Sequence, residues 1–367
     1  MLEIGGRFFD PEKIYESGQV LLGWKRDGRD FLVTSLDRTA RVTENINAVN
    51  TDKSAAYDEK PCEKVYRILC PDEDNAFWKN YFDLDCDYEA IEKAAGAFTT
   101  EFPKRGLAKD ASEKASLKQK ETADGSENEG RKFDMTEIDS EKASPKRELT
   151  ADSFEKDCLK PDAVRDGSEK NNRGCETKSS EMAGQGAKDE YLLSALEYGR
   201  GIRMLRQDLW EALCSFIVSQ NNNIPRITKS IVKIQNGRNR FPTPEELYAD
   251  RERLSECGLG YRDEYLRRLS AELHEGKRCL TVSNNTEEAY KQLLDIHGVG
   301  PKVANCVLLF GLHRMERCPV DTWMRKVFEN HYGGRQPAWT KSPYAGYYQQ
   351  VTFFYERKYL SRKTTET

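Results

Sequence analysis

Lys302 and Asp321 are the two side chains whose types and positions best suit covalent chemistry. Lys302 lies two residues after the turn Gly298–Gly300, and Asp321 lies further along in "CPVDTWMRK". A neutral lysine amine can attack an electrophilic carbon and form a Schiff base. A carboxylate at a helix start can cap the helix or stabilise a developing positive charge. From the residues alone, Lys302 is a nucleophile, a phosphate contact or a solvated surface residue.

The sequence around the turn, "EEAYKQLLDIHGVGPKVANCVLLFGL", predicts a helix, a tight turn and a second helix. Glycines let the backbone turn sharply, and the amide groups at a helix start can meet a phosphate oxygen. We therefore expect Gly298, Val299 and Gly300 to bind a DNA phosphate without reading sequence. The alternative is a turn that joins two core helices.

Amphipathic helices precede and follow this hairpin. "DLWEALCSFIVSQ" predicts a helix with Asp208 as its N-cap. Its apolar stripe consists of Leu209, Leu213, Phe216 and Ile217. Further helices are predicted from "DEYLLSALEYGRGIRML", "TPEELYAD", "TEEAYKQLLDI" and "PVDTWMRKVFENHY". Residues 189–367 are thus expected to form an α-helical domain.

The N-terminal region, 1–103, has a different pattern. Short strand-like runs, "QVLLGW", "DFLVTSL", "ARVTE" and "KVYRIL", alternate with turns such as "RDGRD". The later stretch "NAFWKNYFDLDCDYEAIEKAAGAF" has helical spacing. We expect an antiparallel sheet domain with a helical segment after it.

Residues 104–188 are rich in Lys, Glu, Asp, Ser and Gly, and large apolar residues are sparse. "SEKASLKQKETAD" at 112–124 returns as "SEKASPKRELTAD" at 140–152. Each copy offers too little apolar surface to stack on a neighbour, so a solenoid is rejected. The segment is predicted to be a disordered charged linker, with a regulatory or partner-binding tail as the alternative.

Composition limits the function classes. The net charge is -4, but residues 191–367 carry 27 Lys and Arg against 20 Asp and Glu, or +7, the sign expected for contact with a phosphate backbone. There is no run of about 18 apolar residues and no signal peptide pattern, so we expect no membrane association and no secretion. The 10 cysteines contain no CxxC pair, which argues against a zinc site or a disulfide framework.

Several separate motifs together resemble the 8-oxoguanine DNA glycosylase/AP lyase family, within the helix-hairpin-helix DNA glycosylase superfamily with its Gly/Pro-Asp loop. They are "LLDIHGVGPKVANCVLLF…CPVDTWM", "RMLRQDLWEALCSFIVSQNNNIPRIT", "GLGYRDEYL", "YAGYYQQVTFF" and "SGQ". The resemblance covers nearly all of the chain except the linker. It implies an α+β fold: an N-terminal antiparallel β-sheet domain, then a mainly α-helical helix-hairpin-helix glycosylase fold with a long disordered insert.

The resemblance also implies residue roles. Lys302 corresponds to the nucleophile that displaces the base, and amine attack needs its neutral form. Asp321 corresponds to the aspartate that stabilises positive charge on the sugar. The Gly18 carbonyl would accept the N7 proton that 8-oxoguanine has and guanine lacks. Gln349 would bind the pairing edge of the base. The faces of the base would lie between Cys306 and Phe353; for these two, core packing is the alternative.

By the same resemblance, Asn221, Arg226 and Arg262 match positions that contact the opposite cytosine, and Tyr261 matches the wedge that enters the vacated stack. Phosphate contact or solvent exposure is the alternative for the two arginines.

Three departures from the family pattern are visible. "VLLGW" follows "SGQ" where an aromatic and a basic residue are more usual. Trp323 replaces a histidine found in animal and yeast members. The linker is inserted at an interhelical loop. The departure at "VLLGW" makes the N-terminal side of the base pocket the least secure part of the comparison.

Rival enzyme classes fit less well. No cysteine follows Cys318, unlike in branches with an iron-sulfur cluster, and Lys302 argues against the alkyl-purine branch.

The sequence thus predicts a bifunctional enzyme, a DNA N-glycosylase and AP lyase for base excision repair, acting on 8-oxoguanine opposite cytosine. It would work as a monomer on double-stranded DNA, with no cofactor and no metal, near the nucleoid of a bacterium or in a eukaryotic nucleus. The alternatives are a helix-hairpin-helix glycosylase for another damaged purine and a non-catalytic helix-hairpin-helix DNA-binding protein.

Overall fold

The computed structural model describes residues 1–45, 64–100 and 187–360, without the side chains of the last two. The described residues pack as one compact unit, so the predicted sheet region and helical region lie together. The predicted linker, including its internal repeat, lies outside the described residues except for its last two positions. Its disorder and its boundaries therefore stay predictions.

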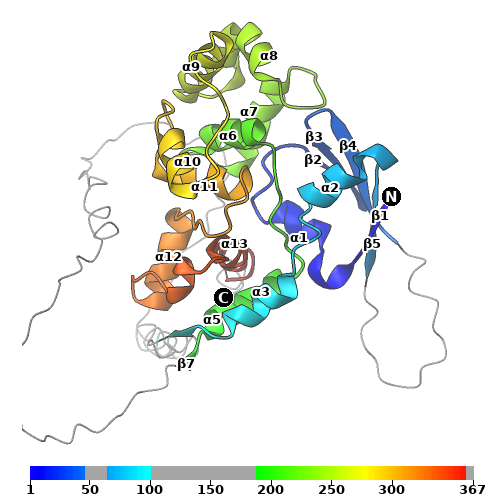
Figure 1. Ribbon diagram of the computed structural model, residues 1–367, viewed down its shortest axis with the longest axis vertical. Coiled ribbons are helices and arrows are strands. Elements are labelled where there is room, and N and C mark those ends of the chain that lie inside the picture. The colour runs from blue at the N-terminus through cyan, green and yellow to red at the C-terminus, as the bar shows by residue number, and fades with distance from the viewer. Residues whose placement is uncertain (46–63, 101–186, 361–367) are drawn as a thin grey trace, which may run out of the picture. The chain divides into compact units, whose positions relative to one another are not determined.

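The sheet has five antiparallel strands in the order β1-β5-β4-β3-β2, drawn in blue in Figure 1. The strands are β1 Leu2–Gly5, β2 Trp24–Asp27, β3 Asp30–Ser35, β4 Arg38–Glu44 and β5 Val65–Leu69. Alternate residues of β3 and β4, such as Val33 and Val42, are buried. One face of the sheet therefore covers a core, as the alternating sequence predicts.

The strand predicted for "QVLLGW" is wrong up to Trp24, where β2 begins. Gly18 and Gly23 have φ angles of 90° and 82°, which an extended strand does not allow. A Cβ on Gly23 would lie 2.2 Å from the Thr34 carbonyl oxygen. The segment between these glycines therefore bends inward instead of pairing with the sheet.

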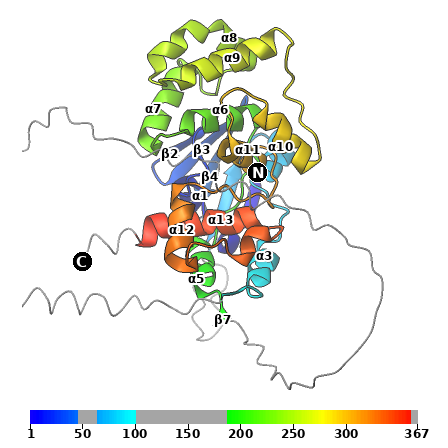
Figure 2. The ribbon, with the colours of Figure 1, turned by 90° about the vertical axis from the view of Figure 1, so that its left-hand side faces the viewer.

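The helices confirm the predicted α-helical region. One helix lies between β1 and β2 in the chain and three more follow the sheet: α1 Pro11–Glu16, then α2 Asn75–Tyr81, α3 Tyr88–Ala95 and α5 Glu190–Gly199. The remainder are α6 Leu209–Ser219, α7 Ile224–Gln235, α8 Pro244–Ala249, α9 Arg262–His274, α10 Thr286–Leu294, α11 Pro301–Phe310, α12 Thr322–Tyr332 and α13 Ala345–Tyr355, which runs into a π-helical turn, η7 Glu356–Leu360. Asp208 caps α6 as predicted, accepting from the Glu211 amide at 3.0 Å. Figure 2 shows α8 and α9 packed side by side.

A short ladder joins the described residues on either side of 101–186. β6 Thr99–Thr100 pairs with β7 Ala187–Lys188 in antiparallel register. Residues 100 and 187 therefore lie side by side, between α3 and α5 in the chain.

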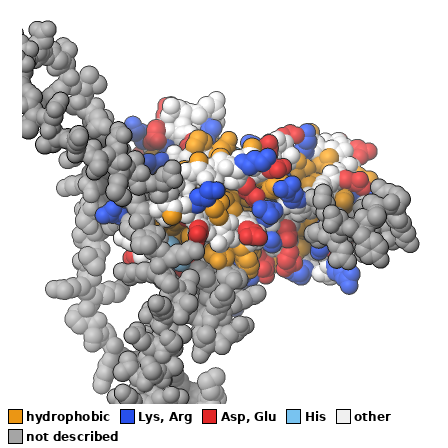
Figure 3. Space-filling view, turned by 90° about the horizontal axis from the view of Figure 1, so that it is seen from below, with side chains coloured by type: hydrophobic (Ala, Val, Ile, Leu, Met, Phe, Trp, Pro, Cys, Tyr) orange, Lys and Arg blue, Asp and Glu red, His pale blue; other side chains and the backbone are white. Residues whose placement is uncertain are grey.

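The described surface mixes both signs of charge. In Figure 3, Lys and Arg side chains are interspersed with Asp and Glu over the part of that face not covered in grey. Every helix in the described ranges is too short or too polar to span a bilayer. Seven of the ten cysteines fall in these ranges, all as free thiols.

Glu211 joins helix α6 to the sheet. Its carboxylate accepts from the Ser35 hydroxyl at 3.2 Å and from the Leu36 amide at 3.1 Å, at the turn between β3 and β4. The side chain is buried, and this burial raises the pKa of Glu211 to about 7, with Asp208 adding to the rise.

Because the folded pKa of Glu211 lies above its unfolded value, the native state binds more protons between about pH 4.5 and 7, and stability falls as pH rises through this window. We predict that Glu211→Gln removes this fall. The free energy of unfolding of the variant minus that of the wild type should be about 1–3 kcal/mol larger at pH 8 than at pH 4.5. Thermal unfolding at both pH values measures the difference. The exposed Glu329→Gln should show none, and an unchanged pH slope in Glu211→Gln would contradict the assignment.

Candidate active site

The predicted hairpin is present as α10, a tight turn and α11. Gly298 has φ 83°, its carbonyl accepts from Gln220 Nε2 at 2.9 Å, and a Cβ there would lie 2.4 Å from the Tyr265 ring. Gly300 caps α11 with φ -94° and open space around it, so only the first glycine is required by the turn itself.

The amides of this turn are not equivalent. The Val299 amide donates to the Ile296 carbonyl at 3.0 Å and is used within the turn. The first-turn amides of α11 have no intrahelical partner. A shallow depression of about 540 Å³ lies beside them, lined by residues 294–300 and Arg268. A phosphate would therefore meet the start of α11 rather than the Val299 amide.

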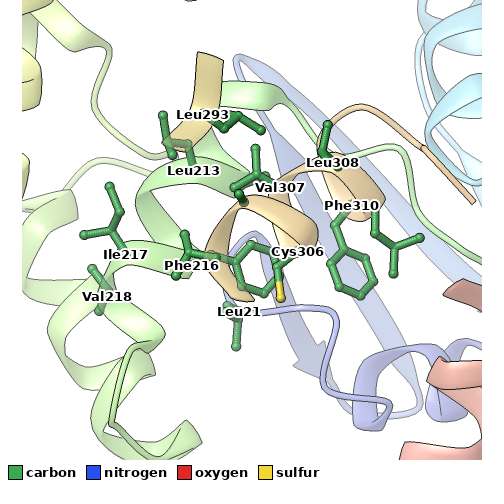
Figure 4. Close-up of a cluster of buried hydrophobic side chains, with 14 of the residues drawn as sticks. Leu21, Leu213, Phe216, Ile217, Val218, Leu293, Cys306, Val307, Leu308 and Phe310 are labelled. Carbon is green, nitrogen blue, oxygen red and sulfur yellow. The ribbon is translucent and has the colours of Figure 1, made fainter. Parts of the chain in front are cut away.

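Lys302 and Cys306 lie one turn apart on α11. The Lys302 ammonium lies 5.5 Å from the centre of the Phe216 ring and within hydrogen-bonding reach of the Cys306 thiol. Figure 4 shows Cys306 and Phe216 close together, with Leu21 of the inward-bent N-terminal segment beside them. The amine is thus half-buried between an aromatic face and a thiol.

Asp321 is in the same cluster. Burial raises the pKa of the Cys306 thiol; Lys302 opposes this rise and Asp321 adds to it, so both charges act on one sulfur. The Asp321 carboxylate accepts from the Met324 amide at 2.9 Å, which confirms its predicted place at the start of α12. Its effect on the sugar stays a prediction.

Gly18 and Phe353, both assigned to the base pocket by the resemblance, lie close together. A Cβ on Gly18 would lie 3.0 Å from a ring carbon of Phe353 and 3.0 Å from Arg357 Nη1. Gln349, one turn before Phe353 on α13, is 6% exposed, and its Oε1 has no hydrogen-bond partner among the described residues. A buried amide oxygen without a partner is costly, so it marks a position where a ligand donor would be stabilised.

The group around Lys302 and the group around Gly18 both lie within range of the Asp321 charge, which affects the pKa of Cys306 and that of Arg357. Helix α12, which Asp321 caps, packs against α13. The structure therefore brings Lys302 together with Cys306, within range of the Asp321 charge, and Gly18 close to Phe353. These residues lie on α11, α12, α13 and the N-terminal segment.

The residues expected at the opposite base lie on α7, α9 and the loops before them. Asn221 is exposed with φ 44°, Arg226 is exposed, and Tyr261 is 50% exposed. Arg262 differs, being 3% exposed; its guanidinium donates to the carbonyls of Gln220, Asn221 and Leu259. In this structure Arg262 shapes the loop that carries Asn221 and stacks on Tyr261 at 4.4 Å.

Four residues around Gly18 were missed by sequence reasoning. The Gln19 side chain donates to the Arg203 carbonyl, and Gln350 donates to the Ser17 carbonyl, so the backbone on either side of Gly18 is held. The Arg203 guanidinium in turn donates to the Phe82 and Phe8 carbonyls, and Arg357 lies beside Gly18. The position of Arg357, four residues after Phe353 on the same helical face, was the signal that could have found it.

No group of three or more His, Cys, Asp and Glu side chains in residues 1–45, 64–100 and 187–360 is placed to hold a metal ion.

Comparison with known proteins agrees with the motifs. No protein-family model matches the chain. An N-glycosylase/DNA lyase from Saccharomyces cerevisiae is 35% identical over 159 residues, covering 36% of this chain and 42% of the relative. A probable N-glycosylase/DNA lyase from Methanothermobacter thermautotrophicus is 33% identical over 181 residues, covering 40% and 58%. The resemblance to the 8-oxoguanine DNA glycosylase/AP lyase family is confirmed. The chain spans about half the length of these two relatives.

The fold is also confirmed. The Clostridium acetobutylicum 8-oxoguanine glycosylase/lyase, solved with double-stranded DNA containing cytosine opposite the lesion, superposes with a TM-score of 0.59. It is 22% identical, and the match covers 96% of this chain and 93% of that one. The sheet followed by helices is therefore also the fold of that glycosylase.

We predict that Gly298→Ala destabilises the hairpin, because the added Cβ meets the Tyr265 ring at a positive φ angle. The free energy of unfolding should fall by about 1–3 kcal/mol. The matched variant Gly300→Ala, whose Cβ meets open space, should lose about 1 kcal/mol or less, since its backbone suits any residue. Denaturant unfolding of both variants measures the difference, and equal losses would contradict this account of the turn.

Proposed function

We propose that the chain is a bifunctional DNA glycosylase and AP lyase that removes 8-oxoguanine opposite cytosine and then nicks the strand. The observation that carries the proposal is the cluster of Lys302, Cys306 and Asp321 at the start of the second hairpin helix. The relatives named N-glycosylase/DNA lyase and the similarity of fold support it.

The first step uses Lys302 as the nucleophile. Its neutral amine forms a bond to C1′ of the sugar, and the N-glycosidic bond breaks with its electron pair leaving on the base, which takes up a proton. Asp321 stabilises the positive charge that develops on the sugar as this bond breaks. Phe216 shields the amine from bulk water on one side.

The second step opens the sugar and nicks the strand. The C1′–O4′ bond breaks, O4′ takes up a proton, and the amine nitrogen becomes a protonated Schiff base with C1′. Loss of a C2′ proton then expels the 3′ phosphate by β-elimination, and water later releases Lys302 from the imine. No external oxidant or reductant enters this sequence.

The damaged base is recognised by one backbone carbonyl and by side chains around Lys302. The Gly18 carbonyl accepts the N7 proton of 8-oxoguanine, which guanine lacks, and the unpartnered Gln349 amide binds the pairing edge. Cys306 and Phe353 contact the two faces of the base. Because Phe353 touches Gly18 in the structure, its ring must move to admit a base.

The opposite strand is read by exposed groups. Asn221 and Arg226 contact the cytosine, Arg262 holds the loop of Asn221 and offers its remaining N–H, and Tyr261 enters the gap in the stack. The start of α11 binds a phosphate. The enzyme acts on double-stranded DNA as a monomer, at the nucleoid or in the nucleus.

Neither alternative function is favoured by a separate observation. A glycosylase for another damaged purine would keep the lysine cluster but lose the preference for 8-oxoguanine. A non-catalytic DNA-binding protein would have no use for a lysine half-buried beside a thiol and a carboxylate.

We predict that borohydride traps a covalent adduct between the protein and a duplex with 8-oxoguanine opposite cytosine. Lys302→Gln should abolish the adduct, because the amide cannot form an imine. Lys291→Gln makes the same charge change at an exposed position of α10 and should retain trapping. An adduct with Lys302→Gln would refute the nucleophile, and duplex binding without any product from the wild type would indicate the non-catalytic alternative.

We also predict that excision is faster opposite cytosine than opposite adenine. Single-turnover rates should differ by about tenfold or more, the discrimination expected from paired hydrogen bonds to a base edge. Arg226→Ala should reduce this ratio, whereas Lys229→Ala, also exposed on α7, should weaken binding to both duplexes alike. Equal rates for cytosine and adenine in the wild type would remove the proposed roles of Asn221 and Arg226.

A further inference from the structure

Arg357 lies where the C-terminal helix meets the N-terminal segment that carries Gly18. It belongs to η7, directly after α13, and is half-buried. Its Nη2 donates to the Glu16 carbonyl, the last residue of α1, at 2.7 Å. Its guanidinium lies 5.1 Å from the centre of the Phe353 ring, and Nη1 would lie 3.0 Å from a Cβ built on Gly18. One side chain thus lies beside two of the residues assigned to recognition of the base.

The backbone around Gly18 is held by α13 at two adjacent points. Gln350 Nε2 donates to the Ser17 carbonyl at 2.7 Å, and Arg357 donates to the carbonyl one residue earlier. Among hydrogen bonds between described residues, none ends on the Gly18 carbonyl. The two preceding carbonyls are therefore fixed while that of Gly18 stays available.

Arg357 makes no ion pair with Asp321. None of the ion pairs within the described ranges joins Arg357 to Asp321, although the Asp321 charge acts on it at longer range. Burial, the largest effect, lowers the pKa of Arg357, but a guanidinium stays charged in water at neutral pH. Its close contacts are with the recognition residues rather than with Lys302.

We propose that Arg357 is a positioning residue for recognition of the damaged base, acting through Gly18 and Phe353 and not through the lysine chemistry. This inference rests on the proposed function. The bond to the Glu16 carbonyl fixes the turn that presents the Gly18 carbonyl, and the flat guanidinium supports the Phe353 ring when the ring moves for the base. An abasic site has no base to recognise, so its reaction with Lys302 should not need Arg357.

The test compares two substrates in the full chain: a duplex with 8-oxoguanine opposite cytosine, and the same duplex with a preformed abasic site. Arg357→Ala should lower the single-turnover excision rate by about ten- to hundredfold, the range for losing a hydrogen bond from a charged group, and leave borohydride trapping on the abasic duplex within about twofold. Arg357→Lys keeps a donor for the Glu16 carbonyl and should recover most of the lost excision rate.

Lys358→Ala is the matched control, because it removes the neighbouring charge, whose ion pair at 3.0 Å ends on the Glu16 side chain and not on the backbone. It should change neither rate by more than about twofold, as expected for a partly exposed ion pair. Equal loss of both reactions in Arg357→Ala, no loss of excision, or the same loss in Lys358→Ala would each overturn the inference. If Arg357→Ala does not fold, Arg357→Gln must show the same split between substrates.

The outcome for the wild type separates the two proposals. A wild-type protein with neither excision nor trapping defeats the proposed function. A wild-type protein with both activities, combined with an Arg357→Ala variant that shows no split, defeats only the role of Arg357.

Discussion

The hydrogen bonds that bury the segment Ser17–Gln19 are the constraint on which the rest of the site depends. Gln19 Nε2 donates to the Arg203 carbonyl at 2.9 Å, and Gln19 Oε1 accepts from the Leu205 amide at 3.0 Å. Gln350 donates to Ser17 from the other side. Buried amides satisfied in this way allow one arrangement only, since any shift leaves polar groups unpaired. The N-terminal region is therefore fixed against α13, and Gly18 faces the helix that carries Gln349.

A second constraint keeps the catalytic residues together. Helix α11 begins at the turn that is suited to a phosphate, and its first turns carry both Lys302 and Cys306. A bound phosphate would thus fix the position of the Lys302 amine relative to the sugar, because this amine and the amides that bind the phosphate both belong to helix α11. Asp321 is brought to the same place by a different helix, whose first turn it caps. In the proposed function, positioning the DNA strand and aiming Lys302 at the sugar are consequently achieved by the same helix.

Local patterns predicted much of the fold and less of the site. Helix caps at Asp208 and Asp321 and the alternation in β3 are determined by neighbours in the sequence, so they could be foreseen. The bend at 18–23 could not, because it depends on Gln19 meeting a segment far along the chain. The buried state of Arg262 was missed for the same reason, since its partners are backbone carbonyls that only the folded loop presents. Motif resemblance assigned roles to residues, but the supporting contacts come from the three-dimensional arrangement.

The ladder between β6 and β7 has a consequence for how such a chain can change over time. Two strands of two residues each bring positions 100 and 187 together beside α3 and α5. The entropic cost of closing a loop grows only with the logarithm of its length. Adding residues between these positions therefore lowers the stability of the fold only slightly once the β6–β7 ladder is formed. Repeats such as "SEKAS" can therefore accumulate there by duplication while α3, α5 and everything they support keep their places. The β6–β7 ladder thus separates a part of the sequence in which insertions are tolerated from a part in which they are not.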